Sequence, residues 1–355
     1  MPYPIPVQTS IRDNILRDHR NLDNTADVAD DSDNWIRASA TSNAIDGLYA
    51  HQQWISKQIF ADTADDDNVL HHASLRGVNL LPGVPSAGKV KLVGTPGMPF
   101  PAGLSGRRPD GVIYTTQAGG NLGADGVRIV AAKANAPGVQ GDCKPGIVLT
   151  ISETPAGLAN TCEVVEMVGG VEQETVAHLL ERYLDLIRRP PAGGNKSDYR
   201  RWAKEVAGVT EAYVYPLRRG LGTVDVVIVS GGNIPSQQTI AATQAHIDDV
   251  RPVTAKNALV LAATVKPVDF TIQVRLFNVS LADATANIKA SLASYFTEII
   301  PGKGFVKSVA EMQISAVAGV TDRVVLAPAG NIDATINAAF IEWLRLGNVT
   351  VRLLP

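Results

Sequence analysis

The sequence contains 355 residues, 45% hydrophobic and 19% charged, which is typical of a folded chain with more than one domain rather than a disordered one. The formal net charge of −3 argues against a general nucleic-acid binder, because neutralising phosphates requires a clustered positive field. The two cysteines, Cys143 and Cys162, are too few for a secreted disulfide scaffold and too far apart for a CxxC motif, so both are expected to be reduced thiols.

Residues 1–72 are expected to form an N-terminal helical arm. Apolar residues recur there at helical spacings, at Ile36, Ile45, Leu48, Ile55 and Ile59. Residues 1–70 hold 12 acidic and 5 basic side chains, whereas residues 71–355 hold 23 and 27. Fields of opposite sign could help subunits to meet, although solvated surface charge without a partner is commoner. The acidic stretch 27–33 lacks the EF-hand spacing and is interpreted as a solvated helix start.

Residues 73–170 are expected to form a β-rich domain. Short apolar runs bounded by Gly or Pro occur at 90–93, 111–114, 127–130 and 146–149, the pattern of strands with turns at each end. Several strands without an intervening helix predict a small β-sandwich-like or barrel-like domain, because an isolated hairpin cannot bury a core.

The segment from Gly83 to Lys89 matches most of a phosphate-binding P-loop. The match ends at Val90, which replaces the Ser or Thr that would bind magnesium, and the residues that follow alternate as in a strand rather than a helix. We interpret the segment as a β-turn.

Residues 171–265 and 266–355 are expected to form two α/β domains, which makes the chain an α+β multidomain protein. Helices are predicted over 172–187, 198–206, 236–250 and 281–299, and strands over 212–215, 223–229, 270–276 and 323–326. The sequence VAGVTE at 206–211 has an echo in VAGVTD at 317–322, each before a strand and each with a Gly suited to a helix C-cap. This echo predicts that the α/β unit is duplicated.

Catalytic, cofactor and metal motifs are not found. The six histidines lie at no HExxH spacing, GxSxG is absent, and no site residue of these kinds is assigned. Basic residues gather near Tyr199 and Trp202, but acidic residues interrupt them, so a charged rim or a protein interface accounts for them better than nucleic acid. Neither a leader nor an apolar run of membrane-spanning length occurs, so we expect a cytosolic product without membrane insertion.

The segment 188–216, RRPPAGGNKSDYRRWAKEVAGVTEAYVYP, resembles a hallmark of the baseplate J-like proteins of Mu-like phages and related contractile devices. Shorter segments support the resemblance in the family's order, from about residue 55 to 270: QIFADTA at 58–64, PFPAG at 99–103, DGVIY at 110–114, GTVDVVIV at 222–229 and RPVTA at 251–255. Before residue 35 and after about 280 the resemblance weakens. The motif residues, expected to be structural or interfacial, are Arg188, Pro190, Pro191, Gly193, Gly194, Asp198, Tyr199, Trp202, Gly208, Val209, Gly222, Arg251 and Pro252.

The resemblance implies a non-enzymatic wedge subunit of a contractile tail baseplate that couples baseplate rearrangement to sheath contraction. Its implied partners are other copies of itself, a second wedge protein, the spike or hub and sheath-initiating proteins, and indirectly the tail fibres. Its implied place is the virion tail, assembled in the bacterial host cytoplasm. A tail-associated binding or hydrolytic module remains the alternative function. The segment from Pro190 to Gly194 is either a hinge between domains or a rigid helix stop.

Overall fold

The computed structural model describes residues 4–354 and divides into two compact units. The first unit comprises the chain up to Leu80 together with Thr175–Ile187, and the second comprises Leu81–Glu174 and Arg188–Pro355. The domain boundaries expected from the sequence remain predictions.

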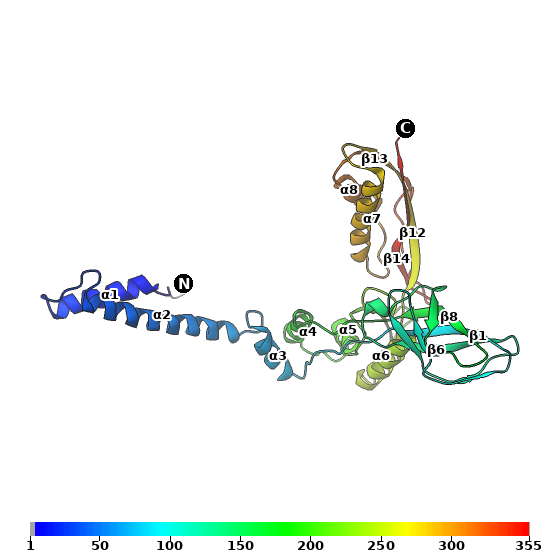
Figure 1. Ribbon diagram of the computed structural model, residues 1–355, viewed down its shortest axis with the longest axis horizontal. Coiled ribbons are helices and arrows are strands. Elements are labelled where there is room, and N and C mark those ends of the chain that lie inside the picture. The colour runs from blue at the N-terminus through cyan, green and yellow to red at the C-terminus, as the bar shows by residue number, and fades with distance from the viewer. Residues whose placement is uncertain (1–3, 355) are drawn as a thin grey trace. The chain divides into compact units, whose positions relative to one another are not determined.

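The first unit is helical, and its helices are α1 (Gln8–Leu22), α2 (Asp33–Gln58), α3 (Asp66–Ser74) and α4 (Val176–Arg188) (Figure 1). Helices α1 and α2 form a hairpin in which Gln8 donates to Ser42 Oγ at 2.7 Å. A separate cluster joins α3 to α4 through Val69, Ala73, Leu179 and Tyr183. The helices of the expected arm are thus present, but the expected apolar face is exposed, because small residues of α2, not its large apolar ones, are buried.

The β-rich domain of the second unit is a closed six-stranded barrel. Its strands follow the order β1 (Ala87–Gly94), β6 (Val127–Ala134), β4 (Ile113–Thr116), β3 (Ser105–Arg107), β7 (Val148–Ile151) and β8 (Leu158–Val168). The small strands β2 (Pro99–Phe100) and β5 (Gly120–Asn121) pair separately, and η1 (Val139–Gly141) follows β6. Of the two expected architectures, the structure has the barrel-like one and not the sandwich-like one, because β1 pairs with both β6 and β8, which closes the sheet on itself.

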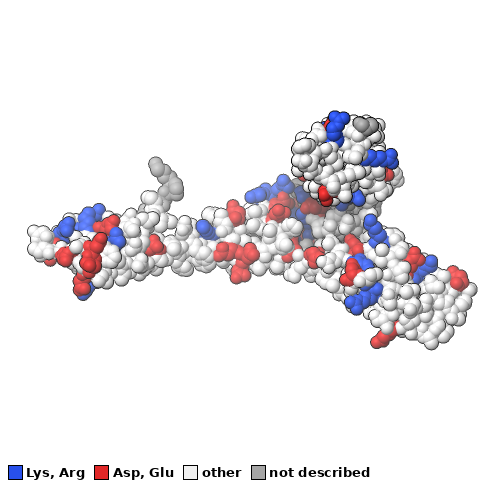
Figure 2. Space-filling model, turned by 45° about the horizontal axis from the view of Figure 1, so that its top comes forward, with Lys and Arg blue, Asp and Glu red and all other residues white. Residues whose placement is uncertain are grey.

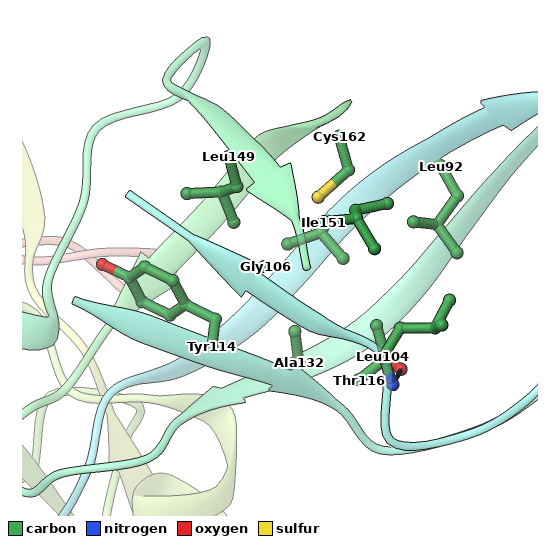
Figure 3. A pocket seen from close by; sticks show the side chains of 10 residues that line it. Leu92, Leu104, Gly106, Tyr114, Thr116, Ala132, Leu149, Ile151 and Cys162 are labelled. Carbon is green, nitrogen blue, oxygen red and sulfur yellow. Dashed lines mark hydrogen bonds between the residues drawn. The ribbon is translucent and has the colours of Figure 1, made fainter. Parts of the chain in front are cut away.

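Side chains fill the barrel (Figure 3). The space left among them is about 10 Å³ and is lined by residues such as Leu149, Tyr114 and Cys162. Such a space is no larger than a single water requires, so the interior is a packed core and not a ligand chamber. The P-loop-like segment does not form a turn, because residues 87–90 are strand β1 and Val90 is buried in this core.

The central domain is a three-stranded sheet in the order β11 (Asn257–Leu261), β10 (Thr223–Val229) and β9 (Glu211–Pro216). Helices α5 (Lys196–Lys204) and α6 (Gln237–Val250) pack against it. Ser236 caps α6 by accepting from the backbone of Thr239. Strand β10 is antiparallel to β9 and parallel to β11, which the crossover through α6 requires.

The C-terminal domain is a second three-stranded sheet, in the order β13 (Val320–Ala327), β12 (Thr264–Leu276) and β14 (Glu342–Leu353). Figure 1 shows α7 (Leu281–Thr297) and α8 (Lys307–Ser315) along one side of this sheet. Gly208 and Gly319, the glycines of the sequence echo, both have positive φ, 95° and 86°. The strands of the two domains are connected in different orders, so the duplication remains a prediction.

The barrel core offers a direct test of this fold. Leu149 is fully buried, whereas its neighbour Val148 is 53% exposed. Leu149→Ala should destabilise the barrel by about 2–5 kcal/mol, because it removes buried methyl groups and leaves a cavity. Val148→Ala should change stability by no more than about 0.5 kcal/mol. Hydrogen exchange of the barrel amides would measure both changes, and equal effects would contradict the barrel topology.

Candidate interaction site in the central domain

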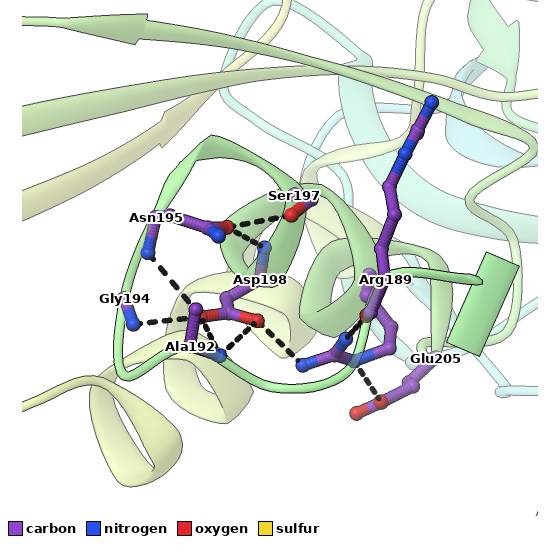
Figure 4. A network of polar contacts seen from close by, with 8 residues as sticks. Arg189, Ala192, Gly194, Asn195, Ser197, Asp198 and Glu205 are labelled. Carbon is purple, nitrogen blue, oxygen red and sulfur yellow. Dashed lines mark hydrogen bonds and ion pairs between the residues drawn. The ribbon is translucent and has the colours of Figure 1, made fainter. Parts of the chain in front are cut away.

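The Asp198 carboxylate organises the loop that begins α5 (Figure 4). It accepts backbone N–H bonds from Ala192 at 3.0 Å, Gly194 at 2.7 Å and Asn195 at 3.2 Å, and Arg201 Nη2 lies 2.8 Å away. Asn195 in turn accepts from the Asp198 backbone, which completes a capping box. The side chain of Asp198 is fully buried, so one carboxylate fixes the backbone of the whole loop to the helix start.

This environment sets the charge state of Asp198. Burial opposes ionisation, but the hydrogen bonds from Gly194, Ala192, Arg201 and Asn195 outweigh burial and hold the pKa of Asp198 below its ordinary value. These bonds hold residues 192–195 against the start of α5, and both the hinge and the rigid helix stop remain predictions for the segment from Pro190 to Gly194.

Several motif residues meet around this loop. Tyr199 is 2% exposed and packs edge-on against Trp202, with ring centroids 5.0 Å apart. Pro252 lies directly against Gly194, since a Cβ on that glycine would be 2.7 Å from the proline Cγ. Arg251 acts electrostatically on Tyr199. The segments 194–199 and 251–252, more than 50 residues apart in sequence, therefore contact each other.

Other motif residues lie elsewhere. Gly208 and Val209 are buried at the opposite end of the central sheet, where Gly208 accepts from Ser230 Oγ and approaches Val84. Gly222 lies in the β9–β10 hairpin beside Lys256. Arg188, Pro190, Pro191 and Gly193 are exposed.

The junction between the barrel and the central domain was not visible in the sequence. Asp142 Oδ1 accepts from Ser86 Oγ at 2.7 Å and from the Gly170 backbone at 2.9 Å, and Asp142 Oδ2 accepts from Asn233 at 3.3 Å. Ser86 and Gly170 lie just outside β1 and β8, whereas Asn233 lies between β10 and α6. Asp142 therefore ties both ends of the barrel segment to the central domain.

The sequence also did not predict a buried ion-pair cluster. Asp225 on β10 is fully buried and pairs with Arg218 and Arg219, whose side chains are 4% and 25% exposed. Arg218 also donates to the Asn337 backbone of the C-terminal domain. An acidic residue inside the valine-rich strand 223–229 was the one available signal.

The basic residues near Trp202 are paired. Arg200 and Lys204 both bond Glu211, and Arg201 bonds Asp198. On the face shown in Figure 2, basic and acidic side chains lie interspersed. The charged-rim interpretation fits these pairings better than a phosphate-binding surface does.

Within residues 4–354, no group of three or more His, Cys, Asp or Glu side chains could hold a metal ion. In the same range no helix is both long and apolar enough to cross a membrane. Cys143 and Cys162 are free thiols.

Family models match the second unit domain by domain. The baseplate J-like protein barrel domain matches residues 89–170, the baseplate J-like central domain matches 191–262, and the baseplate J-like protein C-terminal domain matches 268–352. A barrel followed by two helix-covered sheets is thus the domain series of a known class of baseplate proteins. The chain belongs to the baseplate J-like family.

Curated relatives extend this similarity. Baseplate protein gp47 of Escherichia phage Mu is 29% identical over 324 residues, which cover 86% of this chain and 89% of that protein. Mu-like prophage FluMu protein gp47 of Haemophilus influenzae is 28% identical over 313 residues, 84% of this chain and 88% of that protein. Among solved structures, the cryo-EM structure of the anti-feeding prophage baseplate covers 94% of this chain and 90% of that chain, with a TM-score of 0.38 and 12% identity.

Replacement of Asp198 tests its role. Asp198→Asn should cost about 1–3 kcal/mol of local stability, because the buried amides lose a charged acceptor. The contribution of wild-type Asp198 is fully present above the unfolded pKa of about 3.9 and is lost as the pH falls through the lower folded pKa. Protection of the Ala192 and Gly194 amides from hydrogen exchange, followed as a function of pH, would measure both the cost of the substitution and the loss at low pH. The exposed Asp249→Asn is the charge-matched control, and an acid loss that persists in Asp198→Asn would contradict the assignment.

Two adjacent glycines give a second test. Gly193 has φ +79° with nothing near its missing Cβ, whereas Gly194 has φ +110° and faces Pro252. Gly193→Ala should cost about 1 kcal/mol from backbone strain alone. Gly194→Ala should cost at least about 2 kcal/mol, because the strain is joined by the clash with Pro252. Thermal unfolding of both variants would rank them, and the reverse order would exclude the observed loop.

Proposed function

We propose that the chain is a structural wedge subunit of a contractile phage-tail baseplate, needed for tail assembly and for coupling baseplate rearrangement to sheath contraction. The observation that carries this proposal is the ordered match to three baseplate J-like domains, together with similarity to phage Mu baseplate protein gp47 over most of the chain. The chemistry of the central domain supports it, because its buried carboxylates bind backbone amides and arginines within the chain, as expected for structural residues.

The helical arm supplies a surface for assembly. On α2 and just beyond it, Leu48, Ile55 and Ile59 are 63%, 45% and 60% exposed. Ile45 and these three residues recur at the intervals of three, four or seven residues that place side chains along one stripe of a helix. An exposed apolar stripe of this kind is typical of a surface that another helix covers. We assign to it a helix of a second copy of this chain or of a second wedge protein.

The remaining partners follow from the same role. The spike or hub and the sheath-initiating proteins would contact the subunit directly, and the tail fibres indirectly. The subunit would lie in the virion tail baseplate after assembly in the bacterial host cytoplasm, without nucleic acid or membrane insertion.

The test is complementation of a deletion in the phage, prophage or particle-producing strain that encodes the chain. Wild-type protein should restore contractile tails, and cryo-electron microscopy should place its density in a ring of paired copies around the spike. Leu48→Asp should prevent incorporation, because it adds a charge to the apolar stripe. Asn43→Asp adds the same charge at another exposed position of α2 and should be incorporated normally.

Folding of each variant is checked by circular dichroism. Tails that assemble and contract without this chain would refute the structural role. Cleavage of cell-wall material by the purified chain would instead support the hydrolytic alternative.

A further inference from the structure

Strand β11 lies at one edge of the central sheet, and among residues 4–354 it pairs only with β10. Its side chains at Ala258 and Val260 are buried, 6% and 4% exposed, in the core beneath α5 and α6. In a strand, alternate residues direct their N–H and C=O groups to the same side. An edge strand therefore presents a row of unpaired backbone groups on which a strand of another molecule can form hydrogen bonds.

Gln244 of α6 occupies part of this edge. Its side-chain oxygen accepts from the Val260 N–H at 2.7 Å, and its Nε2 donates to the Ala258 carbonyl at 3.1 Å. The carbonyl of residue i−1 and the N–H of residue i+1 are the two groups that one residue of a neighbouring parallel strand would bind. The Gln244 amide therefore takes the place of the N–H and C=O groups of one residue of an additional strand.

The orientation of this amide is fixed by its neighbours. Gln244 Nε2 also donates to Asp248 Oδ2 at 2.8 Å, and Asp248 Oδ1 pairs with Arg251 at 3.0 Å. The two acceptors, Asp248 and the Ala258 carbonyl, require the nitrogen on their side, and the Val260 N–H requires the oxygen on the other. The motif residue Arg251 thus positions Gln244 through Asp248.

We propose that Gln244 is an edge guard, a side chain that keeps β11 from pairing with a strand of a second copy of this chain. The guard occupies both backbone groups at the middle of the edge, so a pairing strand must first displace it. The chain then associates through its other surfaces and does not extend its central sheet from copy to copy. A subunit that reaches high local concentration during assembly requires such protection.

Gln244→Leu in the full-length chain tests the guard. Loss of two hydrogen bonds that compete with strand pairing should tighten self-association at least about tenfold relative to wild type. Light scattering coupled to size-exclusion chromatography, over a concentration series, would measure the change. Hydrogen exchange of the associated form should show new protection at residues 257–261.

Two control variants show whether tighter association comes from the freed edge or only from an added apolar side chain. Gln238→Leu places the same apolar side chain at an exposed position of α6 and should associate as wild type does. Gln244→Lys should also remain like wild type, because its ammonium can donate to Asp248 and Ala258 and a charge on an edge disfavours pairing. Wild-type association in Gln244→Leu would overturn the proposal, as would equal association in Gln244→Lys or an absence of protection in β11.

Discussion

Strand β10 is buried on both faces, and the arrangement of the central and C-terminal domains depends on that constraint. Val226 and Ile228 belong to the core beneath α5 and α6, whereas Val227 and Val229 belong to a second core with Ile341 and Trp343 of the C-terminal domain. One strand of the central sheet thus contributes side chains to both cores. Packing on both faces of β10 joins the two helix-covered sheets into one body.

Asp225 also restricts how the C-terminal domain docks against β10. A carboxylate in an apolar core costs several kcal/mol unless charges and hydrogen bonds compensate it, and here Arg218 and Arg219 do so. Because Arg218 also reaches the Asn337 backbone, the C-terminal domain must dock where that bond can form. The ion cluster thereby selects one docking position among those that a purely apolar face would tolerate.

Local patterns predicted the elements well but predicted their partners poorly. The helix at 236–250 and the strand at 223–229 were readable because caps and apolar runs are local signals. The sequence could not decide between a sandwich and a closed barrel, since closure depends on β1 pairing with both β6 and β8. The pairing of Arg218 and Arg219 with Asp225 could not be predicted, because Asp225 follows a turn and lies inside a valine-rich strand. The Asp142 bond to Asn233, 91 residues away, had no sequence signal.

An assembling subunit needs some surfaces that bind a partner and others that do not. In this chain, apolar side chains form the first kind and a polar amide protects the second. The stripe on α2 exposes large apolar side chains, and covering them with another helix lowers the free energy. The β11 edge is instead occupied by a polar amide that already satisfies the backbone groups. Association through side-chain packing can select a partner by shape, whereas backbone pairing accepts almost any strand. Blocking strand pairing at the β11 edge, while leaving the α2 stripe free to pack, therefore restricts association to partners that fit the stripe.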